Sequence, residues 1–309
     1  MSKLGPYIYI ARPDHWFKNV FMLPGVALAL VMSPEGLMAH LGSAILGLVA
    51  LCLLASANYT INEFLDAQHD SHHPVKKHRP SVTGQVEGKW VAVQYLALLA
   101  VGLYLSSLIS PYFLGCAVVF VAMGVVYNVP PLRSKDVPYL DVLTEAINNP
   151  LRLVMGWATI ESDMLPPSSI LLSYWMGGAF LMGIKRLAEY RFIADGERAA
   201  LYRKSFAHYN DQSLLLSAFF YALCASFFLA IFLIKYRIEF LLSFPLFAAL
   251  FTWYLALGLK ENSPTQNPEK LFQERSFMLF VLFLVVAVVA LFVIDIPWLR
   301  VLLTRLDYS

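Results

Sequence analysis

The sequence predicts an all-α, polytopic membrane protein with about nine transmembrane helices. Of its 309 residues, 59% are hydrophobic and only 14% are charged, whereas about 25% of the residues in a soluble globular protein are charged. The mean hydropathy is +0.62. The apolar residues form long continuous runs, which are typical of helices rather than of alternating strands. Only helices or closed barrels satisfy their backbone hydrogen bonds in lipid, so we expect helices.

Nine segments are long enough to cross a bilayer, given the about 20 apolar residues that one crossing requires. In chain order they are residues 19–34, 40–61, 90–108, 112–128, 139–160, 168–189, 212–234, 238–259 and 276–299. We therefore expect residues 1–309 to form a single integral-membrane domain. The three cysteines all fall inside apolar runs, where small buried side chains are their usual role.

Lysine and arginine gather on one side of the predicted membrane. Most of the 23 Lys and Arg residues lie in the N-terminal segment and in every second loop after it. The opposite loops, such as MSPEGLMAH and SSLISPY, are nearly uncharged. The positive-inside rule places the N-terminus and the charged loops in the cytoplasm. We expect a multi-pass protein of the inner (plasma) membrane, with the bilayer and not a nucleic acid as its partner.

The stretch NEFLDAQHD, directly after the second predicted span, carries the most distinctive polar pattern. Asn58, Asn62, Asp66 and Asp70 recur every four residues, and each such step turns a helical side chain by only about 40°. They should form one polar stripe, with Glu63 at its border. Mg²⁺ usually takes one or two carboxylates together with substrate phosphates. We therefore predict a magnesium site that holds a diphosphate, with these candidate ligands: Asn62, Glu63, Asp66 and Asp70.

The basic run KKHR follows this stripe, and its Lys77 and Arg79 can contact phosphate oxygens. Two other interpretations remain open. Acidic residues inside a membrane also form proton or sodium relays in transporters. His69 and His73 are spaced like zinc ligands, although no cysteine is near and a phosphate-facing loop is favoured.

Three stretches of the chain resemble the UbiA superfamily of membrane prenyltransferases. NEFLDAQHD is similar to the first aspartate-rich motif, N-D-x-x-D-x-x-x-D, with Glu63 in place of the usual Asp. ARPDHWFKNVFMLPGVAL at 11–28 resembles the R-P-x-x-W-x-K-N segment of the decaprenyl-phosphate phosphoribosyltransferase branch, and YNVPPLRSKDVPYLDVL at 127–143 extends the similarity. The resemblance implies a central cavity that opens to the cytoplasmic side, and a homo-oligomer that in this branch is a trimer.

One feature of that superfamily is absent here. Ordinary members carry a second motif, D-x-x-x-D, after the sixth helix, but residues 183–209 contain no acids four apart. The region instead resembles the K-R-x-x-E and R-x-S-x-x-x-Y patterns of the phosphoribosyltransferase branch, at Lys185, Arg186, Glu189, Arg203, Ser205 and Tyr209. Direct Lys and Arg contacts suit a site that must hold phosphoribosyl diphosphate and a lipid phosphate together.

The resemblance implies that a polyprenyl phosphate attacks C1 of phosphoribosyl diphosphate and that pyrophosphate leaves, with Mg²⁺ as cofactor. The expected catalytic residues are Asn62, Asp66, Asp70, Lys185 and Arg186. The expected substrate-binding residues are Arg12, Lys18, Asn19, Asn58, Lys77, Arg79, Tyr127, Asp141, Arg152, Glu189, Arg203 and Tyr209.

Several alternatives stay open within this scheme. Tyr127 is equally well explained as an interfacial anchor. Arg152 should face the cavity, where it pairs with Glu145 or contacts the lipid phosphate. The competing activity is a prenyltransferase that moves a prenyl group from its diphosphate to an aromatic or other small acceptor.

Overall fold

The computed structural model describes residues 4–33, 36–161, 163–266 and 268–299, which form helices, turns and loops without any strand. The α-helices are α1 Gly5–Ala11, α2 Leu23–Met32, α3 Leu37–Asp70, α4 Gly88–Ser107, α5 Pro111–Asn128, α6 Leu140–Ala146, α7 Asn148–Trp157, α8 Ser168–Ile193, α9 Gly196–Tyr202, α10 Asp211–Tyr236, α11 Phe244–Gly258 and α12 Arg275–Val293. Short 3₁₀ helices include η1 Pro13–Met22, η2 Lys76–His78, η3 Ser134–Asp136, η4 Lys204–His208 and η5 Ile238–Ser243.

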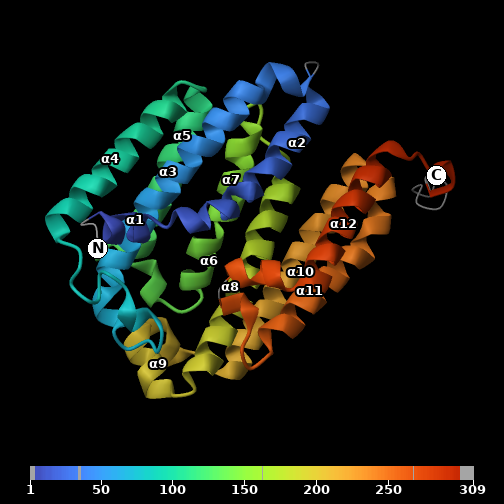
Figure 1. Ribbon diagram of the computed structural model, residues 1–309. Coiled ribbons are helices and arrows are strands. Elements are labelled where there is room, and N and C mark those ends of the chain that lie inside the picture. The colour runs from blue at the N-terminus through green and yellow to red at the C-terminus, as the bar shows by residue number, and fades with distance from the viewer. Residues whose placement is uncertain (1–3, 34–35, 162, 267, 300–309) are drawn as a thin grey trace.

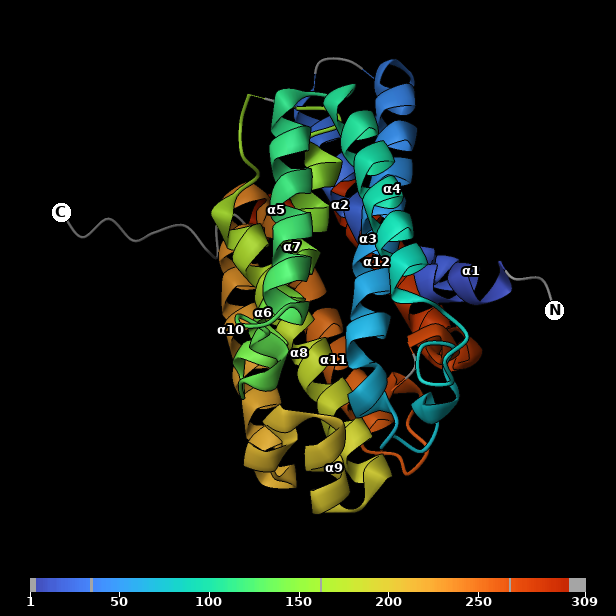
Figure 2. The ribbon, with the colours of Figure 1, turned by 90° about the vertical axis from the view of Figure 1, so that its left-hand side faces the viewer.

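Six helical segments among the described residues are long and apolar enough to cross a membrane: α3, α4, α5, α10, α12 and the stretch Ile238–Gly258. They confirm the predicted all-α, polytopic class. The long helices run side by side, and α9 closes one end of the bundle (Figures 1 and 2). Three charges used to predict the orientation, Lys3, Arg300 and Arg305, lie outside the described residues.

The other three predicted spans are helical but are not simple apolar crossings. In the first, the 3₁₀ helix η1 precedes α2, which has only ten residues. The predicted span 139–160 divides into α6 and α7. The reason is Pro150, which has no N–H to donate to the carbonyl of Ala146, where α6 ends. The sixth, α8, carries Lys, Arg and Glu residues in its last turns.

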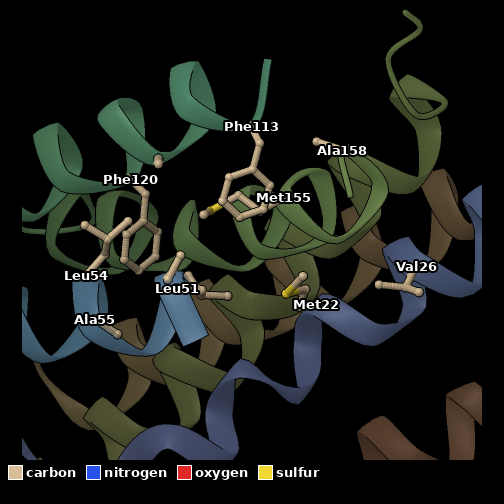
Figure 3. Close-up of a cluster of buried hydrophobic side chains, with 11 residues drawn as sticks. Met22, Val26, Leu51, Leu54, Ala55, Phe113, Phe120, Met155 and Ala158 are labelled. Atoms are coloured by element: carbon tan, nitrogen blue, oxygen red, sulfur yellow. The ribbon is translucent and has the colours of Figure 1, made fainter. Parts of the chain in front are cut away.

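The N-terminal half of the bundle packs around one apolar cluster. Phe113 and Phe120 of α5 lie against Leu51 of α3, and Met22 and Met155 complete the cluster from η1 and α7 (Figure 3). Between helices that span lipid, such close van der Waals packing is a main source of stability. The cluster therefore fixes α3 and α5 relative to each other, and these are the helices that carry the polar stripe and its partners.

Two glycines allow α7 to lie close to the N-terminal segment. A Cβ at Gly25 would lie 1.9 Å from the carbonyl oxygen of Leu153, and one at Gly156 would lie 2.0 Å from that of Met22. Only a residue without a side chain fits at such crossings. This close approach brings η1 against α7.

The loops with most of the polar residues meet at the end of the bundle where α9 lies. The C-terminal end of α3 and the loop that follows it lie beside α9 in both views (Figures 1 and 2). Residues 129–139, between α5 and α6, join the same end. These three segments enclose the site described next.

Candidate active site

The polar stripe predicted from the fourfold spacing lies on one face of α3, because the helix continues without interruption to Asp70. The deeper part of the stripe faces α5. Asn58 Nδ2 donates to the carbonyl oxygen of Phe120 at 3.3 Å. One turn further, Asn62 Nδ2 donates to Asn128 Oδ1 at 2.5 Å. Both amides are thus used to join two helices.

Asp66, the next residue of the stripe, contacts two cations that the sequence analysis did not assign to the site. Its Oδ1 accepts from Arg133 Nη2 at 2.8 Å and lies 2.5 Å from Lys135 Nζ. Both cations come from the loop 129–139, where Lys135 also donates to Asn128 Oδ1. Burial lowers the pKa of Lys135 to about 8, although Asp66 opposes that shift. A sequence signal did exist, because PPLRSK follows the polar end of α5 directly.

Asp70 and Glu63 point toward different cations. Asp70 Oδ2 accepts from Arg79 Nη1 at 2.5 Å. Glu63 is fully buried, and its Oε2 accepts from Arg12 Nη2 at 2.9 Å. Arg79 lies between them, with its Nε 4.0 Å from Glu63 Oε2. Glu63 therefore joins α3 to the N-terminal segment rather than lying beside Asp66.

Two pockets adjoin the end of α3. The smaller has a volume of about 20 Å³ and is lined by Asp66, His69, Asp70, Arg133, Lys135, Asp136, Tyr202 and Arg203. The larger has a volume of about 320 Å³ and is lined by Gln68, His69, His72, Ala200, Leu201 and Lys204. His69 lines both, so the two pockets lie next to each other at the polar end.

The donor set of the smaller pocket fits a magnesium ion that is shared with a substrate. Asp66 and Asp70 line it together, and the contacts above occupy one oxygen of each carboxylate. The described residues contain no group of three His, Cys, Asp or Glu side chains that could hold a metal alone. Substrate oxygens and water would therefore complete the coordination, as is usual for Mg²⁺. Glu63 and Asn62 are engaged with Arg12 and Asn128 instead.

Arg186, predicted to be catalytic, lies outside the residues that line either pocket. It is only 2% exposed. Its Nε donates to Asp141 Oδ2 at 3.3 Å, its Nη1 to Glu189 Oε2 at 3.4 Å, and its Nη2 to Glu145 Oε2 at 2.8 Å and to Tyr127 OH at 3.0 Å. These contacts join α8 to α5 and α6.

Asp141 and Tyr209 also support the site rather than line it. Asp141 is fully buried. Its Oδ1 accepts from Tyr209 OH at 2.7 Å, and its Oδ2 accepts from Ser205 Oγ at 3.2 Å. The Tyr209 oxygen in turn accepts from the backbone N–H of Tyr139 at 2.5 Å. The loop after α9 is therefore fixed to α6.

Glu189 links α8 to the loop that follows α3. Its Oε1 accepts from Lys76 Nζ at 2.5 Å and from Tyr202 OH at 2.8 Å, and it lies 3.7 Å from His73 Nε2. Lys76, which the sequence analysis did not assign, therefore forms an internal ion pair with Glu189. Lys77 is exposed and has no ion pair among the described residues.

On the N-terminal side, Arg152 donates from Nε to Asn19 Oδ1 at 3.0 Å and from Nη1 to the carbonyl oxygen of Asn148 at 3.2 Å. The pairing with Glu145 that was one of two expectations does not occur, because Glu145 binds Arg186. Lys18 Nζ lies 3.1 Å from His15 Nδ1.

Lys185 lies one residue before Arg186 on α8 and is half-buried. It has no ion pair within the described part of the chain, and Lys18 is its strongest charged neighbour. It stays a candidate phosphate contact.

Comparison with known proteins identifies the family of the chain. The sequence profile of the UbiA prenyltransferase family matches residues 20–284. Nodulation protein NoeC of Azorhizobium caulinodans is 29% identical over 209 residues, which cover 68% of this chain and 65% of that protein. Decaprenyl-phosphate phosphoribosyltransferase of Mycolicibacterium smegmatis is 29% identical over 209 residues, which cover 67% of this chain and 63% of that protein. The chain thus matches slightly less than two thirds of the length of these relatives.

A solved structure has the same fold. The UbiA homolog from Archaeoglobus fulgidus, bound to GPP and Mg²⁺, aligns with a TM-score of 0.69 and 21% identity, covering 92% of this chain and 99% of that one. Since the family profile covers most of the chain and the fold agrees, this multi-pass membrane protein is a transferase of the UbiA prenyltransferase family.

Proposed function

We propose that this protein transfers the 5-phosphoribosyl group of phosphoribosyl diphosphate to a polyprenyl phosphate, with Mg²⁺ as cofactor and pyrophosphate as the second product. The observation that carries the proposal is the charge of the smaller pocket. Three cations, Arg133, Lys135 and Arg203, line it beside three carboxylates: Asp66 and Asp70 of α3, and Asp136, which pairs with Arg133. A donor with a diphosphate and a further phosphate needs this many positive groups, whereas a prenyl diphosphate has only the diphosphate.

The carboxylates on α6 and α8 also favour this donor. Asp141, Glu145 and Glu189 all bind Arg186, and Glu189 binds Lys76 as well. They therefore have a cationic partner already and do not offer a second metal site. The similarity to a protein named decaprenyl-phosphate phosphoribosyltransferase, 29% identical, supports the same choice.

The proposed step needs no general base, because the phosphate acceptor is already an anion. One of its oxygens forms a bond to C1 of the sugar, and the bond from C1 to the pyrophosphate oxygen breaks with its electron pair on the leaving group. Arg133 and Lys135 lie at Asp66 and can turn to the diphosphate oxygens. Mg²⁺ held by Asp66 and Asp70 would neutralise the leaving group. Orientation of two reactants is the protein's other contribution.

The orientation of the protein follows from this proposal. Phosphoribosyl diphosphate is a highly charged, water-soluble donor, so the polar end and the N-terminus should face the cytoplasm, as the positive-inside rule also predicts. The trimer implied by the resemblance stays a prediction. A transporter is disfavoured, because the family to which the chain belongs is one of transferases.

The test is a reconstituted assay with purified protein, Mg²⁺, a polyprenyl phosphate and phosphoribosyl diphosphate labelled in the sugar. We expect the label to enter the lipid fraction with one equivalent of pyrophosphate. A matched assay supplies a prenyl diphosphate and an aromatic acceptor. Turnover in the second assay without labelled lipid in the first would show that the protein is a prenyltransferase instead.

A further inference from the structure

Arg203 differs from the other cations that line the smaller pocket. Arg133 and Lys135 bind Asp66 there, whereas Arg203 has no carboxylate within ion-pair distance in the described part of the chain. Its Nη1 is 3.4 Å from Tyr127 OH, and its buried Nε has no hydrogen-bond partner. A buried donor without an acceptor is costly, so this guanidinium is suited to an anionic ligand.

The backbone on both sides of Arg203 is held by buried carboxylates. On one side, Tyr202 OH donates to Glu189 Oε1 at 2.8 Å. On the other, Ser205 and Tyr209 donate to Asp141. The guanidinium carbon also lies 5.7 Å from the centre of the Tyr202 ring. These contacts hold the backbone on either side of Arg203 in place. The guanidinium is therefore preorganised at the pocket before a ligand binds.

The anion that suits Arg203 is a phosphate that does not share the metal. A diphosphate on Mg²⁺ belongs beside Asp66 and Asp70, where Arg133 and Lys135 also lie. Arg203 reaches the same pocket from the segment after α9, and no carboxylate competes for it. A guanidinium binds the oxygens of a phosphate monoester in pairs. The proposed reaction offers two such monoesters, the 5-phosphate of the donor and the phosphate of the lipid.

Resting on the proposed function, we infer that Arg203 binds the 5-phosphate of the donor and thereby selects a phosphorylated sugar. Asp141 and Glu189 are positioning residues that hold the segment carrying it. A donor without the 5-phosphate leaves the Arg203 guanidinium unpaired in the pocket. Sites built around a charged or hydrogen-bonding group discriminate strongly against substrates that lack its partner.

The experiment compares two donors, phosphoribosyl diphosphate and the same sugar diphosphate without its 5-phosphate, in wild-type protein and in Arg203→Met. We expect the substitution to lower kcat/KM for the phosphorylated donor by at least about tenfold. It should leave kcat/KM for the other donor within about twofold, and KM for polyprenyl phosphate unchanged. Arg203→Lys should restore part of the discrimination.

The positioning residues have their own readout. Asp141→Asn should lower the ratio of the two kcat/KM values, which a loss of folded protein alone would not change, and size-exclusion profiles report folding. Equal losses for both donors in Arg203→Met would overturn the assignment. A raised KM for polyprenyl phosphate, with the donor KM unchanged, would assign Arg203 to the lipid phosphate instead.

Direct binding separates this inference from the proposed function. Ribose 5-phosphate, titrated calorimetrically, should bind the wild-type protein and not Arg203→Met. If that difference is found but no phosphoribosyl lipid forms, the site stands and the proposed transfer fails. If wild type and variant bind ribose 5-phosphate equally, the site is wrong whatever the transfer assay shows.

Discussion

The carboxylates of α3 and those around α8 are neutralised in opposite ways. On α3 the acids line a pocket, and each has its own partners from a loop: Arg133 and Lys135 of residues 129–139 at Asp66, and Arg79 at Asp70. Around α8 one buried guanidinium, that of Arg186, serves three carboxylates at once. The first arrangement can exchange partners when a ligand arrives. The second is closed and holds helices together.

The largest expected effect is a loss of activity when an α3 carboxylate is replaced. Asp66→Asn should lower kcat by about 10²–10³-fold, the range found when one charge-stabilising group is removed from an active site. The amide can no longer bind a divalent ion strongly, while the shape of the pocket is kept. The rate of label transfer at saturating substrates measures the effect.

Asp211→Asn is the matched control for that substitution. Asp211 binds Arg191 on an exposed surface away from the pockets, so the rate should stay within about twofold, as exposed ion pairs contribute little. An Asp66→Asn protein as active as this control would mean that the α3 acids do not take part in the reaction.

The second-largest expected effect is a loss of stability when the cluster around Arg186 is broken. Arg186→Met leaves three carboxylates without their shared partner, and breaking a buried ion pair typically destabilises a protein by about 3–5 kcal/mol. Thermal unfolding in detergent should show a large fall in Tm. Lys185→Met, one residue earlier, should change Tm little, because Lys185 has no ion pair in the described part of the chain. Similar melting of the two variants would contradict the distinction drawn between the two regions.

A smaller loss of stability is expected at Tyr209, which contacts Asp141, one of the partners of Arg186. Tyr209→Phe removes the hydroxyl that donates to Asp141 and accepts from the Tyr139 backbone. Leaving such buried groups unsatisfied costs about 1–3 kcal/mol. The unfolding midpoint should fall by less than in Arg186→Met. A neutral result would show that the loop after α9 is not held by this hydroxyl.

The smallest expected effect is a dependence of kcat/KM on pH through Lys135, a partner of Asp66. Burial lowers the pKa of Lys135 to about 8, so its positive charge is lost as pH rises through that value. Because kcat/KM reports the free enzyme, it should fall above about pH 8. In Lys135→Arg the fall should move to higher pH.

Stability should respond to the same titration with the opposite sign. The unfolded chain binds more protons at Lys135 between pH 8 and its ordinary value of 10.5, so the cost of burying its charge is removed and stability rises as pH rises across that window. A loss of activity above pH 8 that coincides with unfolding would therefore not come from Lys135.

The sequence predicted what depends on local periodicity. The fourfold spacing from Asn58 to Asp70 placed four side chains on one helix face, and α3 carries them there. The broken fifth span could also have been read from Pro150. The cations that pair with the α3 carboxylates could not be predicted from the sequence, because Arg133 and Asp66 are 67 positions apart in the chain. Likewise, the sequence shows that Arg186 is basic but not that three carboxylates surround it, since α5 and α6 supply these contacts only through tertiary packing.

The most direct test of this account is a structure of the protein with phosphoribosyl diphosphate and Mg²⁺. We predict that Arg133 and Lys135 leave Asp66 and contact the diphosphate, that the ion lies at Asp66 and Asp70, and that Arg186 keeps all three of its carboxylates. A bound donor with the Asp66 pairs intact, or with Arg186 turned away from Asp141, Glu145 and Glu189 toward a phosphate, would contradict the division between an exchangeable and a fixed set of charges.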